Sequence, residues 1–199
     1  MLLIEATIKE LLKMVDENFM HHQKWYSDYR KVGNYRIDKI VNDEIHFKVK
    51  PSGRHPTHHQ KFYKAVIKFP KIKKIMKLLP QKPSKKAVEK AKERIVETIN
   101  NTDVETFCSC KSASYFGYNY ILTQEKSKYG TQENRFPHIK NPFLKGSICK
   151  HTRYILEDFN IPEIKEIFID LFCYYILSKK YKDYDEDSWK QYLKWKVKL

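Results

Sequence analysis

The chain has 199 residues, is 41% apolar and 14% aromatic, and carries a net charge of +15. So many aromatic residues argue against a disordered polypeptide, and four cysteines are too few for a disulfide scaffold of this length. The longest apolar run, 167–177, contains Asp170 and is shorter than the roughly 20 residues that span a bilayer, so we expect no membrane partner.

The start of the chain lacks the features of a secretory signal. Met1-Leu2-Leu3-Ile4 is followed at once by Glu5, so no apolar core of a signal peptide can form. Together with the low cysteine count, this favours a reducing compartment.

The positive charge is unevenly distributed. Between Lys61 and Arg94 there are 13 lysines and arginines against two acids, whereas between Glu157 and Asp187 nine acids oppose four lysines. A basic segment beside an acidic one favours contact with a polyanion or with an acidic protein surface. An AT-rich genome, whose codons favour lysine, isoleucine, asparagine and tyrosine, explains the same composition without any function.

The N-terminal third changes from a helical to a strand periodicity. Apolar residues at helical spacing predict a helix over 5–18, which the aromatic segment around Trp25 extends or follows. Alternating apolar and polar residues then predict strands, the first two joined by the turn-forming pair Asn42-Asp43. The expected strands are 35–41, 45–49 and 62–69.

The rest of the chain is mainly helical in pattern. Lysines surround an apolar face over 71–79, Pro80 ends that helix, and Ser84 is a suitable N-cap for the next one. A short strand at 104–107 leads into a long aromatic and polar loop over 111–146. The expected helices after Ser84 are 85–100, 149–159, 162–181 and 185–196.

These elements predict an α+β fold, with a small antiparallel sheet, residues 35–69, flanked by helices. We expect an N-terminal α+β region with basic helices, a metal-binding strand–loop–helix module, and a helical C-terminal segment that packs on the same domain. Their boundaries are 1–102, 103–159 and 160–199.

Two short cysteine motifs carry the clearest chemical signal. Cys108-Ser109-Cys110 and Cys149-Lys150-His151 read C-x-C and C-x-H. Three thiolates and one imidazole complete a closed tetrahedral zinc site, and such ligands select zinc over magnesium or calcium. We therefore expect Zn²⁺ on Cys108, Cys110, Cys149 and His151, acting as a structural staple. The alternative, ordinary buried cysteines and a loop histidine, is disfavoured because the two motifs are paired in one chain.

The C-x-C…C-x-H pattern resembles the SWIM-type zinc finger. The resemblance assigns the same four residues as ligands, and it implies that a strand hairpin is joined to a helix within 103–159. The spacer between the motifs, 111–148, has 38 residues and is longer than such fingers usually carry.

The residues between the two motifs form a second pattern. An aromatic stretch, 115–120, is followed by Glu133-Asn134-Arg135-Phe136-Pro137 and by a turn from Asn141-Pro142 to Gly146. This order resembles small cysteine-containing structural proteins encoded by tailed bacteriophages. The resemblance implies a viral source and a role in the virion. We therefore expect a non-enzymatic virion component, made in the cytoplasm of a bacterial host, that contacts other virion proteins and can form homo-oligomers. In agreement with a non-enzymatic role, the sequence has no glycine-rich phosphate loop, G-x-S-x-G or H-E-x-x-H motif.

The alternative function is zinc-dependent binding of DNA or RNA. Lysines of the basic segment would contact phosphates, and spacer aromatics would stack on bases. A lysine-coated helix is equally an ordinary solvated face, and loop aromatics more often pack over the metal site. The candidate residues are Lys71, Lys73, Lys74, Lys77, Lys85, Lys86, Tyr115, Phe116, Tyr118 and Tyr120.

Other histidines and the fourth cysteine are weaker candidates. Five histidines lie before the third strand and outside the expected strands, but no nearby acid or cysteine completes a second metal set, so we expect a solvated loop. His138 lies in the spacer without motif spacing, and Cys173 reads as a small core residue in a helix that is apolar nearly all round. Such a helix is either deeply buried or shared with another chain. The five histidines are His21, His22, His55, His58 and His59.

Overall fold

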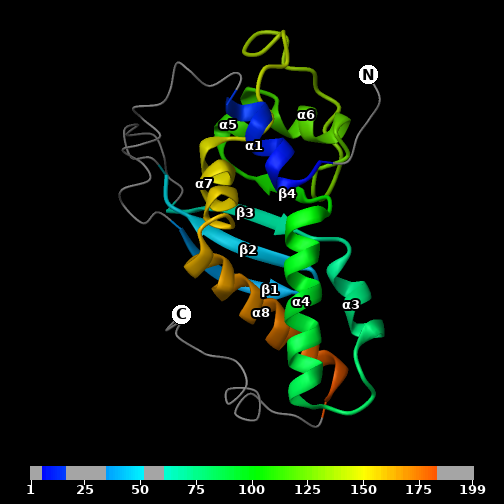
Figure 1. Cartoon of the computed structure of the whole chain (residues 1–199). Helices are drawn as coiled ribbons and strands as arrows, with labels where there is room; N and C mark the ends of the chain where they lie inside the picture. The colour runs from blue at the N-terminus through cyan, green and yellow to red at the C-terminus, as the bar shows by residue number, and fades with distance from the viewer. Residues whose placement is uncertain (1–5, 17–34, 52–60, 183–199) are drawn as a thin grey trace.

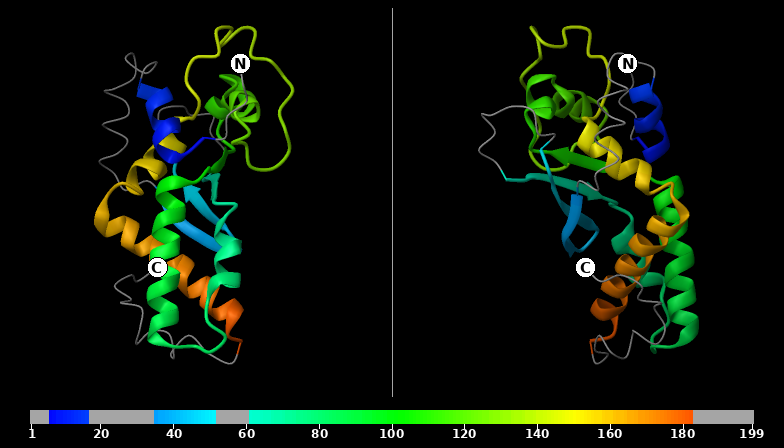
Figure 2. Two further views of the ribbon diagram at one scale, coloured as in Figure 1. Left: turned by 45° about the vertical axis from the view of Figure 1, so that its right-hand side comes forward. Right: turned by 90° about the vertical axis from the view of Figure 1, so that its left-hand side faces the viewer.

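The computed structural model describes residues 6–16, 35–51 and 61–182. Within them, a four-stranded antiparallel sheet in the order β1-β2-β3-β4 has α4, α7 and α8 along one face (Figures 1 and 2). The strands are β1 (Tyr35–Val41), β2 (Glu44–Val49), β3 (Tyr63–Lys68) and β4 (Glu105–Cys108). The helices are α1 (Ile8–Asp16), α3 (Ile72–Leu78), α4 (Lys85–Asn101), α5 (Lys111–Tyr115), α6 (Tyr118–Gln124), α7 (Lys150–Asp158) and α8 (Pro162–Lys180). The expected α+β fold, with a small sheet and a helical C-terminus, is confirmed.

Local sequence signals account for most of these elements. The hairpin between β1 and β2 turns at Asn42, which adopts φ 59°, a left-handed conformation that asparagine tolerates. Ser84 is the N-cap of α4, because its Oγ accepts a hydrogen bond of 3.2 Å from the Ala87 N–H. The expected helix over 185–196, the segment around Trp25 and the five upstream histidines lie outside the described residues.

The prediction of a continuous loop over 111–146 is wrong in its first part, where α5 and α6 form. The Sγ of Cys110 accepts a hydrogen bond of 3.4 Å from the Ala113 N–H and so caps α5. Gly117, at φ +71°, turns the chain between the two helices. Both helices are too short for a helical period to be visible in the sequence.

The sheet also extends beyond the predicted 35–69 region. β4 pairs antiparallel with β3, and this register places Ala65 opposite Cys108. The strand that leads into the first cysteine motif is thus an edge of the same sheet as the N-terminal strands.

The core lies between the sheet and the helices. Phe47 of β2 meets Phe168 of α8 edge to face at 6.1 Å, and Phe168 stacks on Phe159 at 4.2 Å. α8 is buried within this chain, with Cys173 fully inaccessible against α4. Its one buried acid, Asp170, pairs with Lys92 of α4 at 2.5 Å. In the described part of the chain, none of the helices combines the length and apolarity that crossing a bilayer requires.

Candidate metal centre

The first cysteine motif leaves the end of β4 as a tight corner. Cys108 is the last residue of the strand, and Cys110 caps α5. Ser109 between them is fixed to β3, because its N–H donates to the Lys64 carbonyl and its Oγ accepts from the Lys64 N–H, both at 2.9 Å. The corner is therefore part of the sheet, which gives the two sulfurs a rigid support.

The second motif begins α7. Cys149 is the N-cap residue, and its carbonyl accepts a hydrogen bond of 2.9 Å from the Arg153 N–H. His151 follows in the first turn of the helix. Just before this motif, the Ser147 hydroxyl donates to the Leu11 carbonyl of α1 at 3.3 Å. The Ser147 contact places the start of α7 beside α1.

The fold brings the two motifs together into one buried Cys₃His cluster. Each of the four side chains is at most 3% exposed, and their ligand atoms all lie within 4.8 Å of one another. The Nδ1 atom of His151 is 3.9 Å from the Sγ atoms of both Cys108 and Cys149. Tetrahedral zinc bonds of about 2.3 Å to sulfur and about 2.0 Å to nitrogen would separate these atoms by about 3.5 Å. The cluster therefore has the dimensions of a site for one metal ion.

The charges in the cluster also suit a cation. Hydrogen bonds with Cys110 and Cys149, together with burial, raise the pKa of Cys108. For Cys110, the hydrogen bond with Cys108 lowers the pKa, but the one with Cys149 and burial outweigh it, so the pKa is raised. Burial opposes ionisation of Cys149, yet hydrogen bonds from Cys108, Cys110 and His151 lower its pKa on balance. Without a cation the cluster thus favours a single thiolate, and a bound metal ion is what would stabilise all three.

Three neighbours of the cluster belong to neither motif. Tyr63 and Thr152 were not found from the sequence, whereas Tyr118 is one of the spacer aromatics that the sequence led us to expect either on bases or packed over the metal site. The ring of Tyr63 lies 5.2 Å from that of His151, and the Thr152 hydroxyl lies 3.5 Å from the Cys149 sulfur. Burial, aided by the charges of Cys149 and Cys110, raises the pKa of Tyr118 to about 12. The positions of Tyr63 and Thr152 beside the cluster are evident only from the fold.

The spacer between the motifs is ordered by its own polar contacts. The Asn141 side chain donates to the carbonyls of Phe116 and Lys145, at 3.1 and 2.8 Å, and accepts from the Lys145 N–H at 2.8 Å. Gly146 has φ +74°, as the turn before Cys149 predicts. Arg135 binds both carboxylate oxygens of Glu133, at 2.9 and 2.7 Å. The spacer is therefore a defined structure.

Gly117 provides a test of that structure. A Cβ at this residue would meet the Cβ of Pro137 at 2.6 Å, and its φ of +71° is strained for alanine. We expect Gly117→Ala to lower the free energy of unfolding by about 2–4 kcal/mol. Gly130→Ala is the control, because Gly130 has φ +82° but nothing within 4 Å of such a Cβ, and we expect a loss of about 1 kcal/mol. Thermal and denaturant unfolding of both variants measure the difference, and equal losses would contradict the contact with Pro137.

The four candidate aromatics of the spacer divide into two kinds. Tyr115 and Phe116 are 63% and 40% exposed, whereas Tyr118 and Tyr120 are half-buried. Phe116 stacks on Tyr118 at 6.1 Å, and Tyr120 meets Phe136 edge to face at 5.5 Å. Much of this aromatic surface is thus occupied by packing within the module.

The six candidate lysines are all exposed, but they lie on α3 and at the start of α4. Lys71 pairs with Asp103 and Lys73 with Asp43, both at 3.4 Å, and Lys85 lies 3.9 Å from Glu89. The aromatic candidates belong to α5 and α6, at the opposite end of the molecule (Figure 1). The structure does not bring the two halves of the predicted nucleic-acid interface together.

The two remaining candidates lie apart from the cluster. His138 is exposed and its ring lies 4.7 Å from that of Phe136. Cys173 is fully buried in α8, as its apolar surroundings predict. All four cysteines are in the described residues and none forms a disulfide.

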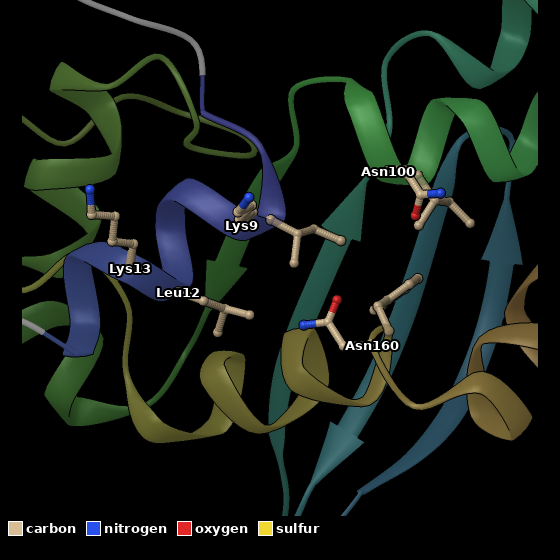
Figure 3. Close-up of a pocket in the computed structure, with 8 residues that line it drawn as sticks. Lys9, Leu12, Lys13, Asn100 and Asn160 are labelled. Carbon is tan, nitrogen blue, oxygen red and sulfur yellow. The ribbon is translucent and has the colours of Figure 1, made fainter.

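A separate concavity of about 510 Å³ lies between α1, the end of α4 and the end of α7 (Figure 3). Two lysines and two asparagines surround apolar side chains there. The lining residues are Ile8, Lys9, Leu12, Lys13, Ile99, Asn100, Phe159 and Asn160. None of these is a cysteine, histidine or acid, so the concavity is not part of the metal centre.

The fold and site thus define an α+β chain with a buried Cys₃His cluster that can hold a metal ion. No protein-family model, curated protein or solved structure matches it.

Proposed function

We propose that this chain is a non-enzymatic structural protein in which Zn²⁺, held by Cys108, Cys110, Cys149 and His151, fixes the spacer for contacts with other proteins. One observation carries the proposal: four buried ligand atoms from two distant motifs lie within 4.8 Å of one another. Thiolate and imidazole ligands in this ratio are typical of structural zinc.

The position of the cluster supports a structural role for the metal. The ion would link the edge of the sheet to the start of α7 and would close the 38-residue spacer into a loop. Closing a long loop removes conformational freedom from the unfolded chain, so a metal there contributes to the stability of the whole module. Four protein ligands leave no coordination position for a reacting water molecule, which is the position a catalytic zinc keeps open.

The assignment to a bacteriophage virion belongs to the same proposal. It is supported by the resemblance of the spacer, from the aromatic stretch to Cys149-Lys150-His151, to small structural proteins of tailed phages. Mass spectrometry of purified particles from the source of this sequence tests it, and absence of the chain from the particles would contradict it.

Nucleic-acid binding is the weaker alternative. The exposed lysines of α3 and α4 favour it, but three of the six pair with acids and all lie apart from the spacer aromatics. An affinity for DNA or RNA whose logarithm falls steeply with the logarithm of salt concentration would support this alternative.

Metal analysis tests the proposed zinc site directly. We expect one zinc ion per chain in protein purified without chelators. Cobalt substitution should give the absorption of a tetrahedral thiolate complex, and azide should leave that spectrum unchanged because no coordination position is open. Protein that binds no stoichiometric transition metal, even after reconstitution, would overturn the proposal. A cobalt spectrum altered by azide would instead indicate an open, catalytic type of site.

A further inference from the structure

Exposed apolar side chains are concentrated in the spacer. In the described part of the chain, six large apolar side chains are exposed, and four of them belong to this segment. Tyr115 is 63%, Phe116 40%, Ile139 90% and Phe143 81% exposed. A folded protein leaves such side chains together in water mainly where a partner covers them.

The contacts within the spacer hold the two segments that carry these four side chains near one another. The amide of Asn141, which lies between Ile139 and Phe143 in the chain, donates to the Phe116 carbonyl at 3.1 Å. Pro137 packs against Gly117, next to Phe116. The segment that carries Ile139 and Phe143 therefore lies against the end of α5, in the part of the molecule that projects beyond the sheet (Figures 1 and 2). We call Tyr115, Phe116, Ile139 and Phe143 the tip surface.

The charges around the tip surface have one sign. The exposed charged side chains of residues 111–146 are all cations, whereas Glu125 is buried and Glu133 is engaged by Arg135. A partner that covers the tip surface must therefore offer negative charge beside an apolar pocket. The exposed cations are Lys111, Lys126, Lys140 and Lys145, together with Arg135, whose charge Glu133 offsets.

We propose that the tip surface docks onto an acidic surface of a partner protein, with Ile139 and Phe143 as the apolar anchors and Lys140 and Lys145 as the charges beside them. The proposal rests on the proposed function, because it names the surface and the partner chemistry of the metal-supported spacer. The Asn141 contacts and the metal cluster order this segment in advance, and that lowers the entropy cost of docking.

The same observations favour protein over nucleic acid as the partner. Ile139, the most exposed of the four, is aliphatic and has no ring face on which a base can stack. Phe116 already stacks on Tyr118, which occupies one of its faces. Aromatic and aliphatic anchors ringed by polar residues are typical of the energetic centre of protein interfaces.

Selection from a random peptide library tests the proposal with the zinc-loaded protein. Peptides enriched on the wild type should combine aspartate or glutamate with large apolar residues. Titrated by fluorescence anisotropy, they should bind Ile139→Ser and Phe143→Ser at least about tenfold more weakly. Leu78→Ser is the matched control, because Leu78 is an apolar residue of α3 that is 52% exposed. The affinity of this variant for the peptides should stay within about twofold of the wild type. A Lys140→Gln/Lys145→Gln variant should lose affinity, and Lys74→Gln/Lys77→Gln should not.

Several outcomes would overturn the proposal. The selected peptides could show no excess of acidic residues, or the tip variants could leave the peptide affinities unchanged. The tip variants could instead weaken binding of oligothymidylate, which would indicate a nucleic-acid surface. They could also abolish self-association measured by sedimentation, which would indicate a surface between copies of this chain. Zinc content is measured in every variant. If a tip variant loses peptide binding but retains one zinc ion per chain, the loss is due to the tip surface. If the wild type holds no zinc yet binds acidic peptides, the proposed role of zinc is contradicted and the docking surface is still supported.

Discussion

Cys149→Ala is expected to abolish stoichiometric metal binding and to lower the free energy of unfolding by at least about 3 kcal/mol. The Sγ atoms of Cys149 and Cys108 each lie 3.9 Å from the Nδ1 of His151. Cys149 is also the N-cap residue of α7. Removing it leaves two thiols and an imidazole, which is an incomplete set for a structural zinc. The stability lost is mainly the binding free energy of the ion, because the unfolded chain has no preformed site.

Cys173→Ala is the matched control for this experiment. Cys173 is as deeply buried as Cys149, but it lies in α8 against α4 and belongs to no cluster. We expect Cys173→Ala to retain one zinc ion and to lower the free energy of unfolding by about 1–2 kcal/mol, because the substitution leaves a small cavity. Elemental analysis and chemical denaturation, each with and without a chelator, separate the two effects. A chelator should destabilise the wild type and Cys173→Ala but not Cys149→Ala, and equal behaviour of the two variants would refute the assigned ligand.

Phe168→Ala is expected to destabilise the fold by about 3–5 kcal/mol without changing the metal site. Phe168 is 1% exposed and joins three elements, because it stacks on Phe159 after α7 and meets Phe47 of β2. Truncation would leave a cavity where α8 covers the sheet, and the surrounding close-packed side chains can collapse into it only in part.

Phe143→Ala is the comparison for that prediction. Phe143 is 81% exposed in the spacer, so truncation removes little buried surface, and we expect a change within about 0.5 kcal/mol. Denaturant midpoints of the two variants give the difference. A loss at Phe143 as large as that at Phe168 would mean that the tip surface is covered within the molecule, and it would also contradict the docking inference.

The four residues of the candidate metal cluster could be identified from the sequence because their chemistry is local. C-x-C and C-x-H are short patterns of rare residue types, and three of the four cysteines fall within them. Strand and helix periodicity likewise predicted β1 to β3, α4 and α8, since burial of one face imposes a period that can be read along the chain. By contrast, α5 and α6 were missed, because five and seven residues are too few to show a period.

The chemistry of the two motifs implied that they meet, but the sequence did not show how the fold brings them together. The 38 spacer residues say nothing about the distance between the motifs. Only the tertiary structure shows that the end of β4 and the start of α7 meet, with the Sγ of Cys108 3.9 Å from the Nδ1 of His151. Similarly, Tyr115 and Tyr118 look alike in the sequence, yet the first is exposed and the second is half-buried beside the sulfurs.

By itself, then, the amino-acid sequence determined the α+β class, the two cysteine motifs and the excess of positive charge. The tertiary structure decided which groups meet: it separated the basic helices α3 and α4 from α5 and α6, and it left four apolar side chains of the spacer exposed. The physical reason is that residue type and periodicity are properties of neighbours along the chain. Burial and charge pairing arise only when segments distant in sequence pack against each other.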